Sequence, residues 1–306
     1  MAQIVVVGSV NIDLTCYLDR WPKVGETITA LENTSCVGGK GANQAVAASR
    51  LGGHVLFVGA VGMDAFGKVA EDALAANDVL LAVEKIGLHT GLAFIDVGPD
   101  GCNIIRLSGG ANRQMASARI DAVAPMFSDA KIVLLQNEID VEVSHAAARI
   151  GRAAGAMVIM DPAPAPAPLW PNDLYAAFDI ITPNATEAGA LLGRLPATLQ
   201  EGFEAAQSLE QALRCGVIIT MGEQGVAWSV GISSGMLDCP VVDAIDTVAA
   251  GDCFNGAMAV ALASGSALDT AIGFAMRAAS MATTKRGALD SLPYLQDVEK
   301  TCSSGF

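Results

Sequence analysis

Asp246-Thr247-Val248-Ala249-Ala250-Gly251-Asp252 runs directly into a segment of small and apolar residues. Phe254, Met258 and Leu262 recur there at helical spacing, so Gly251 and Asp252 are predicted to lie at a helix N-terminus. The free N–H groups and the positive dipole end of such a helix bind anions such as phosphate. The nearly absent side chains of residues 249–251 would let a ligand approach this backbone closely.

Asp252 is the unusual residue of this turn, because a carboxylate repels a bound phosphate. Its presence makes chemical sense if it accepts the proton of a substrate hydroxyl whose oxygen attacks phosphorus. Residues 249–252 would then form an anion hole, with Ala249, Ala250 and Gly251 beside the base. An ordinary Asp in a first helical turn is the alternative interpretation of this segment.

Two further segments make the pattern more specific. They read Gly38-Gly39-Lys40-Gly41-Ala42-Asn43-Gln44-Ala45 and Thr182-Pro183-Asn184-Ala185-Thr186-Glu187. In this order, the three segments resemble the PfkB family of carbohydrate kinases, and within it the ribokinases. The resemblance extends over essentially the whole chain.

Short apolar runs alternate with amphipathic stretches along the chain. The runs are Ile4–Val7, Val55–Val58, Ile132–Leu135, Met157–Met160, Ile180–Thr182 and Val217–Thr220. The amphipathic stretches lie around 64–76, 117–127, 141–154 and 203–214. This alternation predicts a mainly parallel sheet covered on both faces, with ligands beyond the carboxyl ends of the strands. With the resemblance, it predicts one domain over 1–306, a ribokinase-like three-layer α/β/α sandwich.

Segments of about 13–38 and 90–107 do not fit this alternation. The second is predicted to be a hairpin of Gly91–Val97 and Asn103–Leu107, turning at residues 99–101. We expect the two segments to form a small β lid over the sugar end of the site. The resemblance implies the same lid and a homodimer formed through it. Pro162–Pro168 cannot be helical and is predicted to be a stiff surface loop.

Composition excludes several classes of protein. The chain has 306 residues, is 52% hydrophobic and carries a formal charge of −14, which disfavours nucleic-acid and anionic-membrane partners. Seven scattered cysteines without a CxxC motif predict reduced, buried thiols. The first residues resemble a strand and not a signal peptide, and no apolar run reaches membrane-spanning length, so we expect a cytoplasmic protein.

Asn11 and Asp13 are two residues apart on an extended segment, so their side chains point the same way and suit adjacent hydroxyls. Gly39 and Gly41 would let backbone N–H groups approach a small polyol. The resemblance implies that the sugar contacts are Asn11, Asp13, Gly39, Lys40, Gly41, Asn43, Glu138 and the base Asp252.

The phosphate end combines two elements. Asn184 and Glu187 form the Asn-x-x-Glu element that the resemblance assigns near Mg²⁺ and the phosphates, since Mg²⁺ needs few protein oxygens. The segment from Thr220 to Gly225 follows a strand and resembles the ATP loop, with Gly222 and Gly225 permitting close backbone contact; a plain β-turn is the alternative. Gly251 is expected to contact the nucleotide as well.

The resemblance also implies a potassium ion beside the anion hole. Its ligands would be the Asp246 side chain, the backbone of Val248, Ala282, Lys285 and Gly287, and Ser291 Oγ. A helix C-terminus with basic residues and a following glycine explains the 282–291 segment equally well. Cys253, Met276 and Asp290 depart from the residues frequent in the family at these positions.

The predicted reaction is transfer of the γ-phosphoryl group of ATP to the terminal 5-hydroxyl of D-ribose. The alternatives are a kinase for another small sugar or nucleoside, such as 2-deoxyribose or an adenosine-like compound, and a non-catalytic sugar sensor. No Gly-x-x-x-x-Gly-Lys-Ser/Thr loop is present, so the phosphates must be held by other means. A nicotinamide dehydrogenase is excluded because residues 7–11 lack the Gly-x-Gly-x-x-Gly turn.

Overall fold

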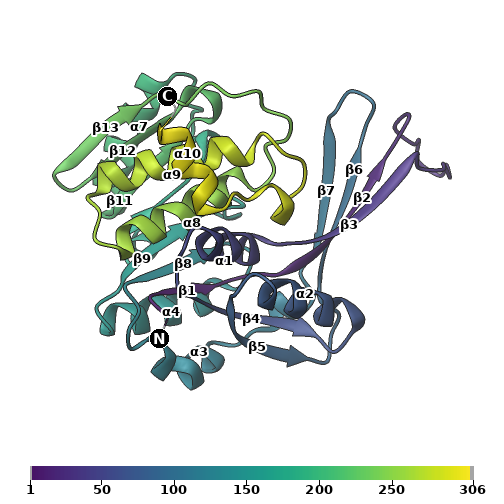
Figure 1. Ribbon diagram of the computed structural model, residues 1–306, viewed down its shortest axis with the longest axis horizontal. Helices are drawn as coiled ribbons and strands as arrows, with labels where there is room; N and C mark the ends of the chain where they lie inside the picture. Colours follow the sequence, from purple (N-terminus) through teal and green to yellow (C-terminus); the bar gives the residue numbers. More distant parts are fainter. Residues whose placement is uncertain (1, 304–306) are drawn as a thin grey trace.

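The apolar runs of the sequence pair into one nine-stranded sheet (Figure 1). The structure is a computed structural model that describes residues 2–303, with side chains described up to Lys300. From one edge to the other the strands are β13 (Ser233–Leu237), β12 (Val226–Val230), β11 (Gly216–Thr220), β10 (Ile180–Ile181), β9 (Met157–Asp161), β8 (Ile132–Gln136), β1 (Ile4–Val7), β4 (Val55–Gly62) and β5 (Leu80–Ile86).

Every neighbouring pair is parallel except β11–β12 and β12–β13, which are antiparallel. The predicted mainly parallel sheet is therefore confirmed. Strands β5, β12 and β13 are absent from the predicted runs. β5 and β13 are edge strands with exposed and polar positions, and Ser229 interrupts the short β12, so none of them is a continuous apolar run.

Helices cover both faces of the sheet and bury two separate apolar cores. One face carries α1 (Lys40–Arg50), α2 (Ala65–Ala75), α8 (Ala250–Ala263), α9 (Leu268–Ala282) and α10 (Leu295–Ser303). The other carries α3 (Ser117–Val123), α4 (Val141–Ala153), α5 (Asn172–Tyr175), α6 (Ala185–Leu192) and α7 (Leu199–Leu213). Strand β1 shows the division, since Ile4 and Val6 join the first core and Val5 and Val7 the second.

The four amphipathic stretches correspond to α2, α3, α4 and α7. The stretch 117–127 is not one helix, because Pro125 begins a short 3-10 turn, Ala124–Phe127, where α3 ends. Segment 162–168 is non-helical as predicted, but Pro162, Ala163 and Pro166 are buried, so only part of it lies on the surface. No helix within residues 2–303 is long and apolar enough to cross a membrane.

A second, four-stranded sheet projects from the main body, on the right in Figure 1. Its strands, in order, are β3 (Glu32–Gly38), β2 (Asn11–Tyr17), β6 (Gly91–Val97) and β7 (Asn103–Ser108). The β6–β7 hairpin is the predicted one, and β2 pairs parallel to β6 and antiparallel to β3. The ends of β2 and β3 nearest the main body carry Asn11 and Gly38, which face each other in register.

The cysteines depart in part from the prediction of buried thiols. Cys215 and Cys253 are buried, but Cys102 is exposed and Cys16, Cys36 and Cys239 are half-buried. All six are unpaired, and the side chain of Cys302 lies outside the described part of the chain. The error arises because strands β2 and β3, which carry Cys16 and Cys36, belong to the thin small sheet and not to the two cores.

The crossing of α1 and α8 brings two segments together that are about two hundred residues apart in the chain. Gly256 lies at this crossing. A Cβ atom at this position would lie 2.7 Å from Ala47 Cβ and 2.8 Å from the Gln44 carbonyl oxygen. The absence of a side chain at Gly256 therefore sets how closely the two helices approach.

We expect Gly256→Ala to lower the free energy of unfolding by about 1–3 kcal/mol, because the added methyl group forces two packed helices apart. Chemical denaturation measures this change. Gly273→Ala in α9 is the matched control, since its Cβ atom would meet no atom closer than 3.7 Å. Equal stability of the two variants would contradict the role given to the crossing.

Candidate active site

Asp252 lies in the first turn of α8 and is buried, with 5% of its surface exposed. Asn43 Nδ2 donates a hydrogen bond to Asp252 Oδ2 at 2.9 Å. Gln44 Nε2 donates to Asp252 Oδ1 at 3.1 Å. Both carboxylate oxygens are thus held by consecutive amide side chains of α1, across the helix crossing at Gly256.

The start of α8 leaves backbone amides free beside this carboxylate. The first regular helical hydrogen bond runs from Cys253 N to Ala249 O at 2.8 Å, and Ala250 N donates to Thr247 O at 3.3 Å. The N–H groups of Gly251 and Asp252 have no acceptor among residues 2–303. Ala249 has a left-handed backbone, with φ of 61°, and a Cβ atom added at Gly251 would meet nothing within 4 Å. The turn is open to a ligand.

The glycines at the start of α1 have a structural reason in addition to any ligand. Gly39 has φ of 89°, and a Cβ atom there would lie 2.8 Å from Asn11 N. A Cβ atom at Gly41 would lie 2.7 Å from Ser9 N. Without side chains at these positions, α1 can begin directly against the chain that enters β2, which brings Asn11, Lys40 and Asn43 into one region.

The remaining residues predicted for the sugar lie around this helix start. Asn11 Oδ1 accepts a hydrogen bond from Asn112 Nδ2 at 2.8 Å. Glu138, just after β8, accepts from Ser9 Oγ at 2.5 Å and from the Lys40 backbone N–H at 3.1 Å. Asp13 is partly buried two residues further along β2 than Asn11, and a Cβ atom at Gly38 would lie 2.2 Å from Asp13 Oδ2.

Several polar residues of the site were not predicted from the sequence. Gln44 and Gln136 are completely buried, Asp161 is 5% exposed and all three are linked by hydrogen bonds. Gln136 and Asp161 are the last residues of the neighbouring strands β8 and β9 and stand in register. The same rule that selected Glu138, a polar residue at the carboxyl end of a parallel strand, would have found Asp161.

Lys40 is surrounded by negative charge. Burial by itself lowers the pKa of its ammonium group, but nearby carboxylates outweigh burial and raise it. These carboxylates belong to Asp161, Asp252, Glu138 and Glu187. Lys40 therefore stays protonated, and its positive charge offsets the electrostatic repulsion between these four carboxylates.

The pKa values of three carboxyl groups are raised as well, which favours their uncharged forms. Burial raises the pKa of Asp252, opposed by the Lys40 charge and by the hydrogen bonds from Asn43 and Gln44. Burial raises the pKa of Asp161 well above its usual range, despite Lys40. Burial, followed by the charges of Glu138 and Asp252, raises the pKa of Asp13 to about 7. In the folded protein, the neighbouring carboxylates of the site therefore repel one another, and Lys40 compensates only part of this repulsion.

Asn184 and Glu187 form a capping box at the start of α6. Glu187 N donates to Asn184 Oδ1 at 2.9 Å, and Asn184 N donates to Glu187 Oε2 at 2.8 Å. The spacing of the Asn-x-x-Glu element is therefore explained locally by helix capping. Glu187 is also buried and close enough to Lys40 for the lysine to lower its pKa, while burial raises it more. Its Oε1 atom makes no hydrogen bond within residues 2–303.

The segment after β11 forms a short 3-10 turn, Gly222–Gln224. Thr220 N donates to Pro183 O at 3.1 Å, which joins this turn to the segment before α6. Gly222 has φ of 60° and open space at its Cβ position, as a ligand contact requires. Gly225 differs, because a Cβ atom there would lie 2.0 Å from Leu237 O. Packing against the end of β13 thus requires glycine at position 225.

The residues predicted for potassium come from two loops that are fastened together. Asp246 Oδ2 accepts from Gly287 N at 2.9 Å, Asp246 Oδ1 accepts from Val248 N at 3.0 Å, and Asp246 N donates to Thr283 O at 3.1 Å. Ala282 O accepts from Lys285 N, and Ser291 Oγ donates to Ala288 O at 2.9 Å. The carbonyl oxygens of Val248, Lys285 and Gly287 accept no hydrogen bond within residues 2–303. The described side chains contain no cluster of three or more His, Cys, Asp or Glu residues suited to a metal.

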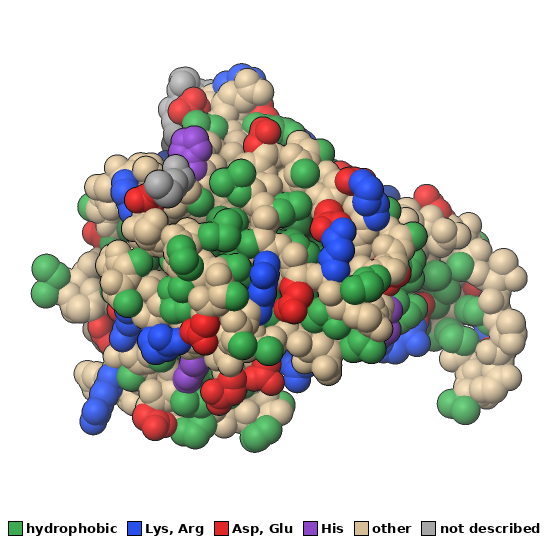
Figure 2. Space-filling view, turned by 90° about the horizontal axis from the view of Figure 1, so that it is seen from below, with side chains coloured by type: hydrophobic (Ala, Val, Ile, Leu, Met, Phe, Trp, Pro, Cys, Tyr) green, Lys and Arg blue, Asp and Glu red, His purple; other side chains and the backbone are tan. Residues whose placement is uncertain are grey.

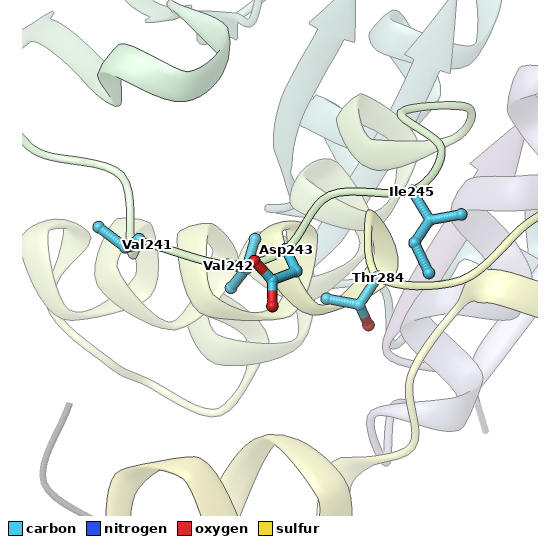
Figure 3. A pocket seen from close by; sticks show the side chains of 5 residues that line it. All are labelled: Val241, Val242, Asp243, Ile245 and Thr284. Atoms are coloured by element: carbon cyan, nitrogen blue, oxygen red, sulfur yellow. The ribbon is translucent and has the colours of Figure 1, made fainter.

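A pocket of about 610 Å³ opens beside these loops (Figure 3). Val241, Val242, Asp243 and Ile245 line it from the loop between β13 and α8, and Thr284 lines it from the segment after α9. Ile245 N donates to Thr283 O at 2.7 Å, which fixes one wall on the other. These residues were not predicted from the sequence. Three apolar side chains in a loop before a glycine-containing turn could have indicated a binding pocket there.

We expect Asp13→Asn to raise the free energy of unfolding at pH 8 by about 1–3 kcal/mol, because it removes a buried charge that faces two other carboxylates. An unfolded aspartate releases its proton near pH 4, so the folded protein binds more protons between about pH 4 and 7. The stability of the unaltered protein should therefore fall as pH rises through this window, and that of Asp13→Asn should fall less. Denaturation at several pH values measures this.

The exposed residue Asp19 gives the control for this experiment, since Asp19→Asn removes an equal charge from the surface. A pH dependence in Asp13→Asn equal to that of the unaltered protein would contradict the raised pKa of Asp13.

Comparison with known proteins identifies the family of this chain. The model of the family described as pfkB family carbohydrate kinase matches residues 1–295. A ribokinase of Bacillus subtilis is 37% identical over 306 residues, covering 99% of this chain and all of the relative. A deoxyribokinase of Salmonella typhimurium is 32% identical and covers 98% of both chains.

A solved structure of Arabidopsis thaliana ribokinase, complexed with ribose and ATP, superimposes with a TM-score of 0.87. It is 33% identical and covers 98% of this chain and 98% of that chain. The fold class and the family resemblance predicted from the sequence are both confirmed. This chain belongs to the pfkB family of carbohydrate kinases.

Proposed function

We propose that this kinase transfers the γ-phosphoryl group of ATP to the 5-hydroxyl of D-ribose and releases ribose 5-phosphate. The observation that carries the proposal is the buried carboxylate of Asp252 beside unpaired backbone amides at an open helix start. This arrangement suits a base that must act next to a phosphoryl group. The similarity to ribokinases over nearly the full chain supports ribose as the sugar.

Asp252 is assigned the role of general base. Burial favours its protonated form, while Lys40 and the amides of Asn43 and Gln44 favour the carboxylate. Its proton affinity therefore lies closer to that of a sugar hydroxyl than the affinity of an exposed aspartate does. The free amides of Gly251 and Asp252, which follow Ala249 and Ala250 in the turn, would stabilise the charge that spreads over the phosphoryl oxygens.

The ribose hydroxyls are assigned to Asn11, Asp13, Asn43 and Glu138 and to the backbone of residues 39–41. Asn43 Oδ1 is buried without a hydrogen-bond partner among the described residues, so a hydroxyl donor would complete it. Hydroxyl donors would likewise favour the charged form of Asp13. Lys40 would remain close to the reacting oxygens and compensate the negative charge that ATP brings.

ATP is assigned to the strip between the Thr220 turn and α8. Gly251 and Gly222 have open space, and the Asn184–Glu187 element lies beside Lys40, with Oε1 of Glu187 uncommitted. Magnesium bound with ATP would neutralise phosphate charge, and such ions usually keep several waters as ligands. Gly225 is assigned an indirect role in binding ATP, because it ends the turn that carries Gly222. The adenine base is assigned to the pocket of Val241, Val242, Asp243, Ile245 and Thr284, where three apolar side chains could contact it.

A potassium ion is assigned to the loops of Asp246 and Gly287. The oxygen donors would be Asp246, the carbonyls of Val248, Ala282, Lys285 and Gly287, and Ser291. The carbonyls of Val248, Lys285 and Gly287 accept no hydrogen bond from the described chain, so their lone pairs are free for a cation or for water. The ion would hold the loop of residues 246–248 and thereby the start of α8.

We also propose a homodimer formed through the small sheet, which would close over the sugar as a lid. Figure 2 shows hydrophobic side chains gathered on this projecting sheet. Its exposed apolar residues include Phe94, Ile104, Ile105 and Leu107, and the exposed Leu31 directly precedes β3. A protruding apolar patch is typical of an interface.

The unpaired state of the six described cysteines supports action in the cytoplasm.

The second candidate substrate is 2-deoxyribose, because a deoxyribokinase matches the chain over the same length. Asp13 favours ribose in this choice. Its carboxylate, with a pKa raised to about 7, needs hydroxyl donors, and a sugar lacking one hydroxyl would leave a buried acceptor unpaired.

We expect ribose to give the highest kcat/KM for ADP release in a panel of pentoses, hexoses, 2-deoxyribose and nucleosides, with potassium increasing the rate. Asp252→Asn should keep ribose binding but lower kcat at least about a hundredfold, as loss of a positioned base does. Coupled assays and calorimetry measure these quantities. The proposal is lost if ribose is no better than the other sugars, and the base assignment if Asp252→Asn turns over normally.

We expect Gly251→Ala to lower kcat about tenfold or more while leaving the free energy of unfolding unchanged or higher. Alanine favours the helix, but its methyl group enters the open space before the amides that face the phosphoryl group. Steady-state kinetics and denaturation test the two parts. Gly273→Ala should gain the same helical stability without losing turnover, and normal turnover in Gly251→Ala would argue against an anion hole there.

A further inference from the structure

Gln44 is a completely buried side chain to which the proposed reaction assigns no contact with sugar or ATP. It lies in the first half of α1, one residue after Asn43. A buried amide is costly unless all its polar atoms are paired, so its partners indicate what it does.

The amide of Gln44 directs both its N–H donors and its carbonyl oxygen at three other buried side chains. Its Nε2 donates to Asp252 Oδ1 at 3.1 Å and to Asp161 Oδ2 at 3.0 Å. Its Oε1 accepts from Gln136 Nε2 at 2.7 Å. The opposite orientation would place Oε1 against two carboxylates, so these neighbours define the direction of the amide.

Gln136 holds this orientation from the sheet. It is the last residue of β8, stands in register with Asp161 of β9 and is completely buried. A Cβ atom at Gly8, the residue directly after β1, would lie 1.9 Å from Gln136 Oε1, so the backbone at this position confines the side chain. The arrangement therefore links two strand ends, through one amide, to the first turn of α8.

We infer that Gln44 is a positioning residue for phosphoryl transfer, whose amide ties the Asp252 carboxylate to Asp161 and fixes the direction in which that carboxylate meets the sugar hydroxyl. The inference rests on the proposed role of Asp252 as the base. With Asn43 on Oδ2 and Gln44 on Oδ1, the carboxylate cannot rotate without breaking a hydrogen bond. Each oxygen retains lone-pair capacity for the hydroxyl proton.

The two hydrogen bonds from Asn43 and Gln44 to Asp252, here called the clamp, also affect the pH range in which Asp252 is charged. The charged groups that face it are Lys40, Asp13, Glu138, Asp161 and Glu187. Burial raises the pKa of Asp252, and donation by Gln44 is one of the interactions that lower it. Without that donation, Asp252 keeps its proton to higher pH, and less of the enzyme has a working base as pH falls.

Two variants at this position separate the donors from the packing. Gln44→Met keeps an unbranched chain of similar length without the donors. Gln44→Glu also keeps the shape and the acceptor for Gln136, but offers at most one proton to two carboxylates. We expect kcat for ribose to fall about ten- to a hundredfold in both, as misplacement of a reacting group does, with an unchanged KM. The acidic limb of the kcat–pH profile should move to higher pH, most in Gln44→Glu.

A direct measurement accompanies the kinetics. In protein labelled with ¹³C at the aspartate carboxyl carbon, the Asp252 signal is assigned by its loss in Asp252→Asn. Its titration midpoint, in the absence of sugar and ATP, should move to higher pH in both Gln44 variants. This titration reports on the clamp whether or not ribose is the substrate, whereas failure of the proposed function appears in the unaltered enzyme as a wrong substrate preference.

Gln211→Met, on the exposed side of α7, is the control for the exchange of glutamine for methionine and should leave kcat and the titration unchanged. Normal kcat in both Gln44 variants overturns the inference. Lower kcat with the Asp252 midpoint and the pH profile both unmoved overturns it as well, because a merely structural loss gives that result.

Discussion

The distance between helices α1 and α8 is the constraint on which the site depends. Gly256 lets the two helices approach until Ala47 and the backbone of Gln44 lie against α8. At that separation Asn43 and Gln44 reach both oxygens of Asp252. The glycines at 39 and 41 play the same part at the other end of α1, where they set it against the chain entering β2. Close backbone packing thus decides where the polar side chains meet.

Like charge is the second organising feature. One lysine, Lys40, lies among the carboxylates of Glu138, Asp161, Glu187 and Asp252, and Asp13 lies next to two of them. Neutral amides supply most of the direct hydrogen bonds to these groups, and Lys40 forms no ion pair shorter than 4.0 Å in the described chain. Amides orient a carboxylate without cancelling its charge, so the carboxylates remain able to accept protons or hydroxyl donors.

The sequence was most informative where a residue pattern has one structural meaning. Continuous apolar runs predicted the central parallel strands, and the small-residue turn before Phe254 predicted the helix start at Asp252. The edge strands β5 and β13 contain exposed and polar positions, so runs of apolar residues did not reveal them. The contact of Gln44 with Gln136 and Asp161 arises only through tertiary packing, which no local sequence pattern reveals, although the position of Asp161 at a strand end marks that residue itself. Gly225 and the Asn184–Glu187 pair show that a family motif can also have a local structural cause.

Ala249 carries a consequence for the turn before α8. An alanine in the left-handed region costs about 1 kcal/mol relative to glycine, and this residue stands there with φ of 61°. A glycine at position 249 would remove this backbone strain. It would also give the unfolded chain and the ligand-free turn many more backbone conformations. The methyl group of Ala249 therefore adds a small backbone strain but restricts the conformations of the turn. The amides that follow are thus oriented before an anion binds.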